Sequence, residues 1–188
     1  MTSDDPTIRV VGTAPNAIFV AGFMGSGKST VGRTLGSRLG WPFVDLDDEI
    51  EQAAGLTIPE IFEEFGEQGF RDREHNALRD QAARGLAGHR FVLALGGGTY
   101  AYARNRDLLR QIGPTLWIDV DADTLWRRVR GATHRPLAHD PGAFKRLHAS
   151  RKDSYAKAEH RIDGAGSVAE VVARIFGLGW MQDLLADA

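Results

Sequence analysis

A glycine-rich segment near the start of the chain constrains its fold more than any other feature. Residues 22–29 read GFMGSGKS and match the phosphate-binding pattern G-x-x-x-x-G-K-[ST] at every fixed position. Residues 17–21 before it, AIFVA, form a short apolar run that is typical of a parallel strand buried on both faces. After it, Val31, Leu35 and Leu39 repeat at four-residue spacing, which predicts a helix. The motif therefore lies between a strand and a helix, which is the context that phosphate binding needs.

The residues of this loop suit contact with a nucleotide. Glycines allow backbone N–H groups to converge on phosphate oxygens, and the N-terminus of the following helix adds the positive end of its dipole. Lys28 can reach the β- and γ-phosphates, and the Ser29 hydroxyl can bind Mg²⁺. The alternative is a glycine-rich turn with a chance lysine. The motif predicts a bound nucleotide but does not identify the group that accepts a phosphate from it.

Further short apolar runs alternate with helical patterns along the chain. The runs that we interpret as strands are residues 43–45, 91–95, 115–120 and the short segment 161–163. Helices are expected after the capping box Thr57–Glu60, after a cap at Asp121 or Asp123, over about 143–159 and from Ser167 onward. This alternation predicts βαβ units, and hence an α/β fold with one parallel sheet covered on both faces.

The length of the chain fits one domain. At 188 residues, a folded chain buries roughly 70% of the surface that its unfolded form exposes, which is enough for one core without disulfides. We expect residues 1–16, which show little periodicity, to form a flexible N-terminal arm, and residues 17–188 to form the single domain. The tail from Gly177 holds apolar residues that can pack back as a short helix.

The composition excludes several classes of protein. The chain has no cysteine, which rules out a disulfide scaffold, a thiolate metal site and a cysteine nucleophile. The longest apolar run, residues 17–24, is far shorter than the roughly 20 residues that cross a bilayer, and the first residues do not resemble a signal peptide. We therefore expect a cytoplasmic protein that does not bind a membrane.

The net charge of −2 gives no general attraction to nucleic acid or to an anionic membrane. The charge is nevertheless uneven, because residues 45–74 hold 11 acidic and 2 basic residues, whereas residues 121–161 hold 10 basic and 5 acidic residues. These stretches could be solvated helical faces of opposite sign, or the basic stretch could contact an anionic ligand. Its basic residues are not interleaved with aromatic ones in the manner of a nucleic-acid-binding surface, so no nucleic-acid partner is expected.

The rest of the chain narrows the kind of nucleotide-binding protein. It has no Asn/Thr-Lys-x-Asp motif, with which GTPases read their base, and its third apolar run ends in Gly96–Gly98 where a large ATPase would have a metal-binding Asp. Another carboxylate must then help Ser29 to hold Mg²⁺. Asp45 and Asp47 follow the second strand two residues apart, so both could face the phosphate loop. Alternatively, Asp47 or Asp48 caps the next helix, and both roles are compatible.

Six motifs, in order along the chain, resemble those of the shikimate kinase family. They are GFMGSGKST, FVDLD, IFEEFGEQGFRDRE, LALGGG, a basic segment with Arg135-Pro136-Leu137, and LHASRKDSY, and they span about residues 17–176. The resemblance implies a three-layer α/β/α fold of the nucleoside-monophosphate-kinase type, with a five-stranded parallel sheet and a mobile lid at about residues 131–142. It also implies transfer of the ATP γ-phosphate to the 3-hydroxyl of shikimate, which gives shikimate 3-phosphate and ADP in aromatic amino acid biosynthesis. We further expect a monomer that needs Mg²⁺.

The resemblance also implies which residues bind ATP. Lys28 and Arg135 would be catalytic, because both would neutralise charge on the transferred phosphate, and Arg135 would do so when the lid closes. Arg128, one of three arginines within residues 127–130, would lie beside adenine. The implied ATP-binding residues are Gly25, Ser26, Gly27, Lys28, Ser29, Thr30, Arg128 and Arg135.

The carboxylates of FVDLD take separate tasks in this resemblance. Asp45 would hold Mg²⁺ through water, next to Ser29, which would bind the ion directly. Asp47 would be catalytic, since it would bind the substrate hydroxyls and accept the proton of the attacking one.

The carboxylate of shikimate favours planar guanidinium groups as partners. The matching residues are Arg71 and Arg151. Glu74 would brace Arg71, and the backbone N–H groups of Gly97 and Gly98 would approach the substrate. Each assignment has a plainer alternative. Arg71 could form an exposed helical pair with a nearby glutamate, Arg151 could be a solvated residue of a basic helix, and the glycines could form a tight turn that needs positive φ.

Two other functions fit the same motifs less well. A carbohydrate kinase such as gluconate kinase shares the loop and a carboxylate-bearing polyol substrate, although GFRDRE and GGG weigh against it. A ligand-sensing module of the kind fused to transcription regulators would keep the fold, but the chain is too short to add a helix-turn-helix domain.

Overall fold

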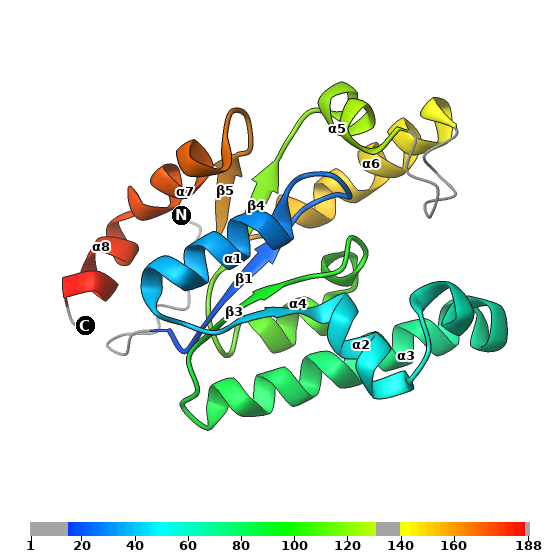
Figure 1. Cartoon of the computed structure of the whole chain (residues 1–188), viewed down its shortest axis with the longest axis horizontal. Helices are drawn as coiled ribbons and strands as arrows, with labels where there is room; N and C mark the ends of the chain where they lie inside the picture. Colours follow the sequence, from blue (N-terminus) through cyan, green and yellow to red (C-terminus); the bar gives the residue numbers. More distant parts are fainter. Residues whose placement is uncertain (1–14, 131–139, 187–188) are drawn as a thin grey trace, which may run out of the picture.

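The computed structural model describes residues 15–130 and 140–186, and within them five strands form a parallel sheet (Figure 1). The strands are β1 (Ala17–Ala21), β2 (Phe43–Asp45), β3 (Phe91–Ala94), β4 (Thr115–Asp119) and β5 (His160–Asp163). Their order in the sheet is β2-β3-β1-β4-β5, and every neighbouring pair is parallel. The predicted five-stranded parallel sheet is confirmed, although β3 and β4 each end one residue earlier than expected and β5 begins one residue earlier.

Helices connect the strands and cover the sheet. They are α1 (Lys28–Leu39), α2 (Leu46–Ala54), α3 (Ile58–Leu86), α4 (Ala103–Leu109), α5 (Ala122–Val129), α6 (Pro141–Tyr155), α7 (Val168–Phe176) and α8 (Gly179–Ala186), with a short 3₁₀ helix η1 (Thr99–Ala101). In Figure 1, α1 and α7 lie side by side, and these two helices pack against each other, as α3 does against α2 and α4.

The central strands are buried on both faces. Every residue of β1 and β3 is buried, as are the first four residues of β4. The continuous apolar runs of β1 and β3 leave no polar side chain to face water, so a stable sheet needs helices on both sides. This burial fixes the strands firmly, and with them the loops that follow their carboxyl ends.

Side chains at the N-termini of the helices determine where several of them begin. Asp45 caps α2, because its carboxylate accepts a hydrogen bond from the backbone N–H of Asp47, whereas the alternative considered from the sequence was a cap at Asp47 or Asp48. The capping box Thr57–Glu60 begins α3 as predicted. Asp121, one of the two predicted candidates, caps α5.

Helix α6 differs from its predicted range at both ends. Asp140 caps it and Pro141 is its first residue, two positions before the predicted start. It ends at Tyr155 rather than near residue 159. Proline is favoured in the first turn of a helix because its missing N–H would have no partner there, which explains the earlier start.

Helix α3 is broken at Gly66. This residue has φ of 67° and ψ of −174°, which are not helical values, and Figure 1 shows the two pieces of α3 on either side of the break. A φ in the left-handed region favours glycine. The longer piece after the break carries Arg71 and Glu74, both buried, whereas Phe62 and Phe65 before it are 39% and 40% exposed. The break thus separates an anchored part of α3 from a more exposed part.

The C-terminal tail packs back on the domain as predicted, since α8 contacts α7 and buries Met181 and Leu184. Of the predicted N-terminal arm, only residues 15 and 16 are described, and Asn16 Nδ2 donates to the carbonyl oxygen of Gly85. Most of the predicted lid, with Arg135, also lies outside the described residues. Across residues 15–130 and 140–186, no helix is long and apolar enough to cross a membrane.

Candidate active site

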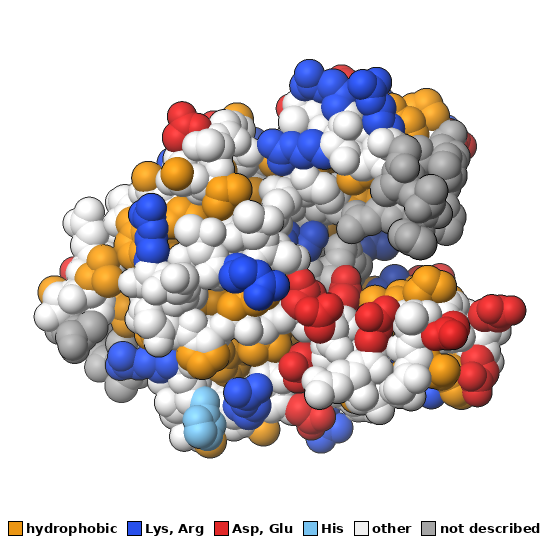
Figure 2. Space-filling model, viewed as in Figure 1, with side chains coloured by type: hydrophobic (Ala, Val, Ile, Leu, Met, Phe, Trp, Pro, Cys, Tyr) orange, Lys and Arg blue, Asp and Glu red, His pale blue; other side chains and the backbone are white. Residues whose placement is uncertain are grey.

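The predicted site residues gather where β1, β2 and β3 end. β1 leads into the phosphate loop at Gly22, β2 ends at Asp45, and β3 leads into Gly96–Gly98. Because these strands are neighbours and run parallel, their ends meet at the edge of the sheet where α/β proteins bind ligands. In Figure 2 the surface is hollowed beside this edge, between α5, over which Lys and Arg side chains gather, and α2, over which Asp and Glu side chains gather.

The phosphate loop has a backbone shape that its glycines allow. Gly25 and Gly27 have φ of 81° and 90°, in the left-handed region. A Cβ at Gly25 would also lie 2.6 Å from Cγ1 of Val129, so α5 packs closely on the loop. Lys28 begins α1, and its Nζ donates to the carbonyl oxygen of Phe23 over 3.2 Å. The amine therefore reaches back across a loop whose N–H groups and helix N-terminus suit phosphate.

Ser29 and Asp45 form the candidate magnesium position. Ser29 Oγ donates to Asp45 Oδ2 over 2.6 Å, and Asp45 Oδ1 accepts from the N–H of Asp47 over 3.2 Å. Mg²⁺ prefers oxygen ligands and commonly takes one or two from protein, with phosphates and water supplying the rest. Within the described part of the chain, no group of three or more His, Cys, Asp or Glu side chains could hold a metal ion. The oxygens of Ser29 and Asp45 are of the kind that Mg²⁺ prefers, and they fit an ion whose other ligands are phosphates and water.

Asp47 lies against the glycine turn that follows β3. A Cβ at Gly96 would lie 2.7 Å from Asp47 Oδ1, so this carboxylate occupies space that only a glycine leaves free. Burial, followed by the negative charge of Asp45, raises the pKa of Asp47 to about 6, against the opposing charge of Lys28. A carboxylate with such a pKa is largely ionised at neutral pH and is more basic than an ordinary aspartate, which suits it to accept a proton.

Arg71 is held in a buried position on α3. It is 9% exposed, its Nη1 lies 3.1 Å from Glu74 Oε2, and its Nη2 lies 3.4 Å from Glu67 Oε1. Its guanidinium carbon also lies 5.0 Å from the ring centre of Phe70 and 5.1 Å from that of Tyr102. Nε has no hydrogen-bond partner among the described residues. The helical ion pairs of the alternative explanation are therefore present, but the arginine that makes them is buried rather than exposed.

Arg151 approaches the same glycine turn from α6. Its Nη1 donates to the carbonyl oxygen of Gly97 over 2.7 Å, and the hydroxyl of Tyr155, one helical turn further on, donates to the same oxygen over 2.5 Å. A Cβ at Gly98 would lie 2.7 Å from Arg151 Nη1 and 2.9 Å from Arg71 Nη1. The two guanidinium groups therefore meet at Gly98, in an arrangement that suits a carboxylate.

The glycines of this turn are needed for close approach and not for unusual backbone angles. None of Gly96–Gly98 has a positive φ, so the alternative explanation by positive φ is wrong. Gly96 and Gly98 instead leave space for Asp47 and for the two arginines. Gly97 has more room, since the nearest atom to a Cβ there would be the backbone nitrogen of Met24 at 3.8 Å.

Arg128 faces the phosphate loop from α5. Its Nη1 donates to the carbonyl oxygen of Gly25 over 3.2 Å, whereas Arg127 donates to the hydroxyl of Thr124 within its own helix. Of these two arginines, Arg128 is thus the one beside the nucleotide-binding loop.

The remaining predicted nucleotide-binding residues are placed in different ways. Ser26 is 3% exposed, and its hydroxyl has no hydrogen-bond partner within the described chain. Thr30 is exposed on the first turn of α1. Arg135 lies outside the described residues.

Three residues that touch the predicted site were missed from the sequence. They are Thr99, whose hydroxyl donates to Glu74, Tyr102 beside Arg71, and Tyr155 at the glycine turn. Tyr155 follows Arg151 by four residues, and this spacing on a predicted helix would have placed both on one face. No sequence signal distinguished Thr99 or Tyr102.

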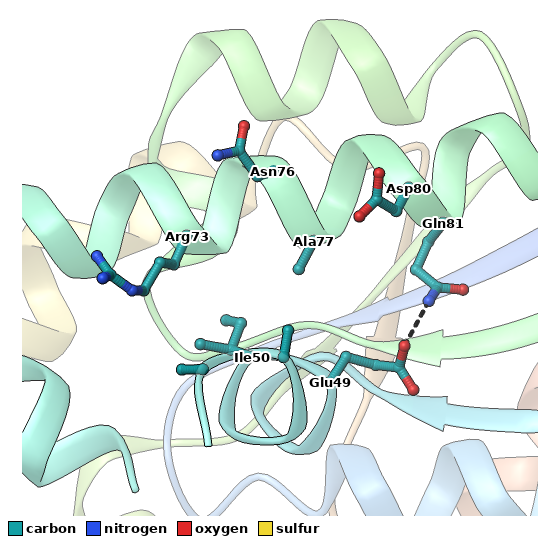
Figure 3. Close-up of a pocket in the computed structure, with 9 residues that line it drawn as sticks. Glu49, Ile50, Arg73, Asn76, Ala77, Asp80 and Gln81 are labelled. Atoms are coloured by element: carbon teal, nitrogen blue, oxygen red, sulfur yellow. Dashed lines mark hydrogen bonds between the residues drawn. The ribbon is translucent and has the colours of Figure 1, made fainter. Parts of the chain in front are cut away.

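Two hollows lie near α3. The one in Figure 3, of about 180 Å³, lies between α2 and α3, where Gln81 Nε2 donates to Glu49 over 2.8 Å, and none of the predicted site residues lines it. The other, of about 630 Å³, is lined by Glu67, Gln68, Arg71, Tyr102 and Arg104. Only the second therefore adjoins the candidate site.

The chain is similar in sequence to a well-defined family. A sequence model described as "Shikimate kinase" matches residues 24–177. The shikimate kinase of Ruegeria pomeroyi is 41% identical over 174 residues, which cover 89% of this chain and 87% of the relative. That of Symbiobacterium thermophilum is 44% identical over 165 residues, which cover 84% of this chain and 92% of the relative.

Solved structures of shikimate kinases are also similar to this chain. A shikimate kinase from Acinetobacter baumannii in complex with shikimate has a TM-score of 0.80 and 35% identity, with 93% of this chain and 95% of that one covered. A shikimate kinase from Aquifex aeolicus has a TM-score of 0.77 and 35% identity, with 85% and 94% covered. A gluconokinase from Sinorhizobium meliloti has a TM-score of 0.58 at 20% identity, with 93% and 95% covered, and shares the fold alone.

Proposed function

This chain belongs to the shikimate kinase family, and on that premise we propose that it transfers the γ-phosphate of ATP to the 3-hydroxyl of shikimate, giving shikimate 3-phosphate and ADP. The observation that carries the proposal is the meeting of Arg71 and Arg151 at Gly98, beside Asp47 and next to the phosphate loop. Two guanidinium groups and a carboxylate match an acceptor that has one carboxylate and several hydroxyls.

Arg71 and Arg151 bind the carboxylate of shikimate in this proposal. Arg71 is held by Glu74 and Glu67 and keeps its Nε without a partner in the described chain. Arg151 keeps donors besides the Nη1 that contacts Gly97. Two prearranged cations lower the cost of ordering the site around an anionic substrate.

Asp47 orients the attacking hydroxyl and accepts its proton. Its raised pKa of about 6 improves it as a base while leaving it ionised at neutral pH. Phosphoryl transfer depends mainly on positioning and on neutralising charge, and Lys28 on the phosphate loop supplies one positive charge. Arg135 supplies a second from the lid.

Mg²⁺ would be held by Ser29 directly and by Asp45 through water, together with phosphate oxygens. When bound, the ion neutralises charge on the transferred phosphate. The oxygens of Ser29 and Asp45 already lie 2.6 Å apart, so little rearrangement of the protein is needed to offer both to one ion. Arg128, beside the loop at Gly25, would contact adenine.

The remaining expectations belong to the same proposal. They are one domain over residues 17–188 with an arm at 1–16 and a lid at about 131–142, a monomer that binds only small molecules, a cytoplasmic location, and a place in aromatic amino acid biosynthesis. Size-exclusion chromatography with light scattering tests the monomer.

One experiment separates this function from gluconate phosphorylation. ADP release is measured with Mg²⁺-ATP and shikimate, with gluconate, and without an acceptor. We expect turnover with shikimate alone. Turnover with gluconate only, or equal ADP release without an acceptor, contradicts the proposal. Arg71→Ala should then raise the KM for shikimate far more than the KM for ATP, with Arg79→Ala, an exposed arginine on the same helix, as the control.

A further inference from the structure

The buried hydroxyl of Thr99 contacts Glu74, the carboxylate that holds Arg71. The proposed function assigns Arg71 to the binding of the acceptor. The carboxylate of Glu74 is 1% exposed and accepts from Arg71 Nη1 on one side and from Thr99 Oγ1, over 2.7 Å, on the other. Thr99 is 0% exposed and begins η1 directly after the glycine turn. A buried carboxylate needs donors that satisfy its oxygens. Thr99 is therefore one of the donors that fix the orientation of Glu74.

Thr99 is itself fixed through its backbone. Its carbonyl oxygen accepts from Asn105 Nδ2 over 3.0 Å, and Oδ1 of the same amide lies 2.7 Å from His75 Nδ1. An amide oxygen can only accept, so His75 Nδ1 carries the hydrogen. His75 follows Glu74 on α3. Two consecutive residues of α3 are thus linked to Thr99, one directly and one through Asn105, which is 1% exposed.

The carboxylate of Glu74 also lies near a like charge. A Cβ at Gly96 would be 2.7 Å from Asp47 Oδ1, 3.0 Å from Thr99 Oγ1 and 3.3 Å from Glu74 Oε1, so three oxygen atoms surround one glycine. The Thr99 hydroxyl donates to the Glu74 oxygen that lies on this side. It therefore holds in place a carboxylate that stands between the proposed base and the proposed acceptor-binding arginine.

We propose that Thr99 is a positioning residue for the acceptor: its hydroxyl, anchored by Asn105 and His75, orients Glu74, and Glu74 orients Arg71 toward the carboxylate of the substrate. This inference rests on the proposed function. The hydrogen bonds in this series link Asn105, Thr99 and Glu74 to Arg71, the proposed acceptor-binding arginine, so the effect should fall on the acceptor more than on ATP.

Thr99→Val removes the hydroxyl and keeps the shape, whereas Thr99→Ser keeps the hydroxyl. We expect Thr99→Val to raise the KM for shikimate roughly tenfold, the usual effect of removing a hydrogen bond to a charged group, with the KM for ATP unchanged. Thr99→Ser should restore most of the acceptor affinity. Thr115→Val, an equally buried threonine in β4, is the control and should leave both KM values unchanged. Equal rises in both KM values, or a serine variant as impaired as the valine one, would overturn the inference.

A double-mutant cycle tests the route through Glu74. In a Glu74→Gln background, Thr99→Val should have little further effect on the KM for the acceptor, because the group through which it acts has been changed. The same tenfold effect in both backgrounds contradicts the proposal. If the unchanged protein phosphorylates gluconate and not shikimate, the proposed function fails, and the same comparison made with gluconate still decides the role of Thr99.

Discussion

The hydroxyl of Tyr155 donates to the carbonyl oxygen of Gly97 over 2.5 Å, and this bond ties α6 to the turn that follows β3. The same oxygen accepts from Arg151, so the turn, the arginine and the tyrosine form one unit. Burial raises the pKa of Tyr155 to about 12, and its hydroxyl therefore keeps its proton and remains a donor at any physiological pH.

Removal of this hydroxyl should loosen acceptor binding. We expect Tyr155→Phe to raise the KM for shikimate several-fold, because Arg151 and the turn lose a shared anchor, and to lower the free energy of unfolding by about 1 kcal/mol. Steady-state kinetics and urea unfolding measure the two effects. Tyr100→Phe is the matched control, since Tyr100 is also fully buried and donates to the carbonyl oxygen of Lys157. If both variants lose stability but neither changes the KM, the bond of Tyr155 is only structural.

The pKa of Asp47 should appear in the pH dependence of catalysis. With a value of about 6, the carboxylate becomes protonated below that pH and can no longer accept a proton from the acceptor hydroxyl. We expect kcat/KM for shikimate to fall as the pH decreases through about 6. A profile that stays flat down to pH 5 means that Asp47 does not act as the base.

The buried carboxylate of Asp47 should also destabilise the folded protein. Its pKa is raised from 3.8 to about 6 in the folded state, so the folded chain binds this proton more tightly than the unfolded chain. The contribution of Asp47 to stability therefore declines as the pH rises from about 4 to about 6, and stays low above that. Asp47→Asn should abolish most activity and yet raise the free energy of unfolding at pH 7 by up to about 3 kcal/mol.

Asp48→Asn is the control for this stability test, because Asp48 is exposed on the same helix. It should change activity and stability far less than Asp47→Asn does, because the charge of Asp48 is only a minor cause of the raised pKa of Asp47. A less stable Asp47→Asn variant would show that contacts of Asp47, rather than the penalty for its burial, dominate.

The space that Gly96 leaves for Asp47 and Thr99 should be essential for catalysis. Gly96→Ala places a methyl group 2.7 Å from Asp47 Oδ1 and 3.0 Å from Thr99 Oγ1, so one of these groups must move. We expect kcat to fall at least 100-fold, which corresponds to roughly 3 kcal/mol of lost transition-state stabilisation. Gly179→Ala, at the start of α8, is the control, since a Cβ there would meet no atom of the described residues within 4 Å. Equal losses of kcat in the two variants contradict this explanation.

The metal position can be tested separately from the acceptor. Asp45→Asn keeps an oxygen that can cap α2 but removes the charge beside Ser29. We expect the Mg²⁺ concentration that gives half-maximal activity to rise about tenfold, with the KM for shikimate changed little. Titration of activity with Mg²⁺ at saturating ATP measures this. An unchanged Mg²⁺ requirement would exclude Asp45 from the metal site.

The centre of the sheet was largely predictable because β1 and β3 are buried on both faces, which imposes the continuous apolar runs AIFVA and FVLA. The residue that caps α2 could not be predicted, because Asp45, Asp47 and Asp48 are chemically equivalent in the sequence. Only the backbone turn determines which carboxylate accepts from the free N–H. The sequence also did not show why residues 96 and 98 are glycines. A glycine that allows other groups to approach closely cannot be distinguished in the sequence from one that adopts a positive φ. Thr99 acts through a contact between distant segments, which no local pattern encodes.

The phosphate loop and the glycine turn emerge from β1 and β3, which are hydrogen-bonded neighbours, with Val20 paired to Ala94. Adjacent strands in a sheet stand about 4.8 Å apart, and the backbone ladder maintains that spacing. The distance between the proposed nucleotide site and the proposed acceptor site is therefore fixed by the spacing of these two strands. A change of acceptor could consequently evolve through side chains on α3 and α6, while the distance over which the phosphate travels stays constant.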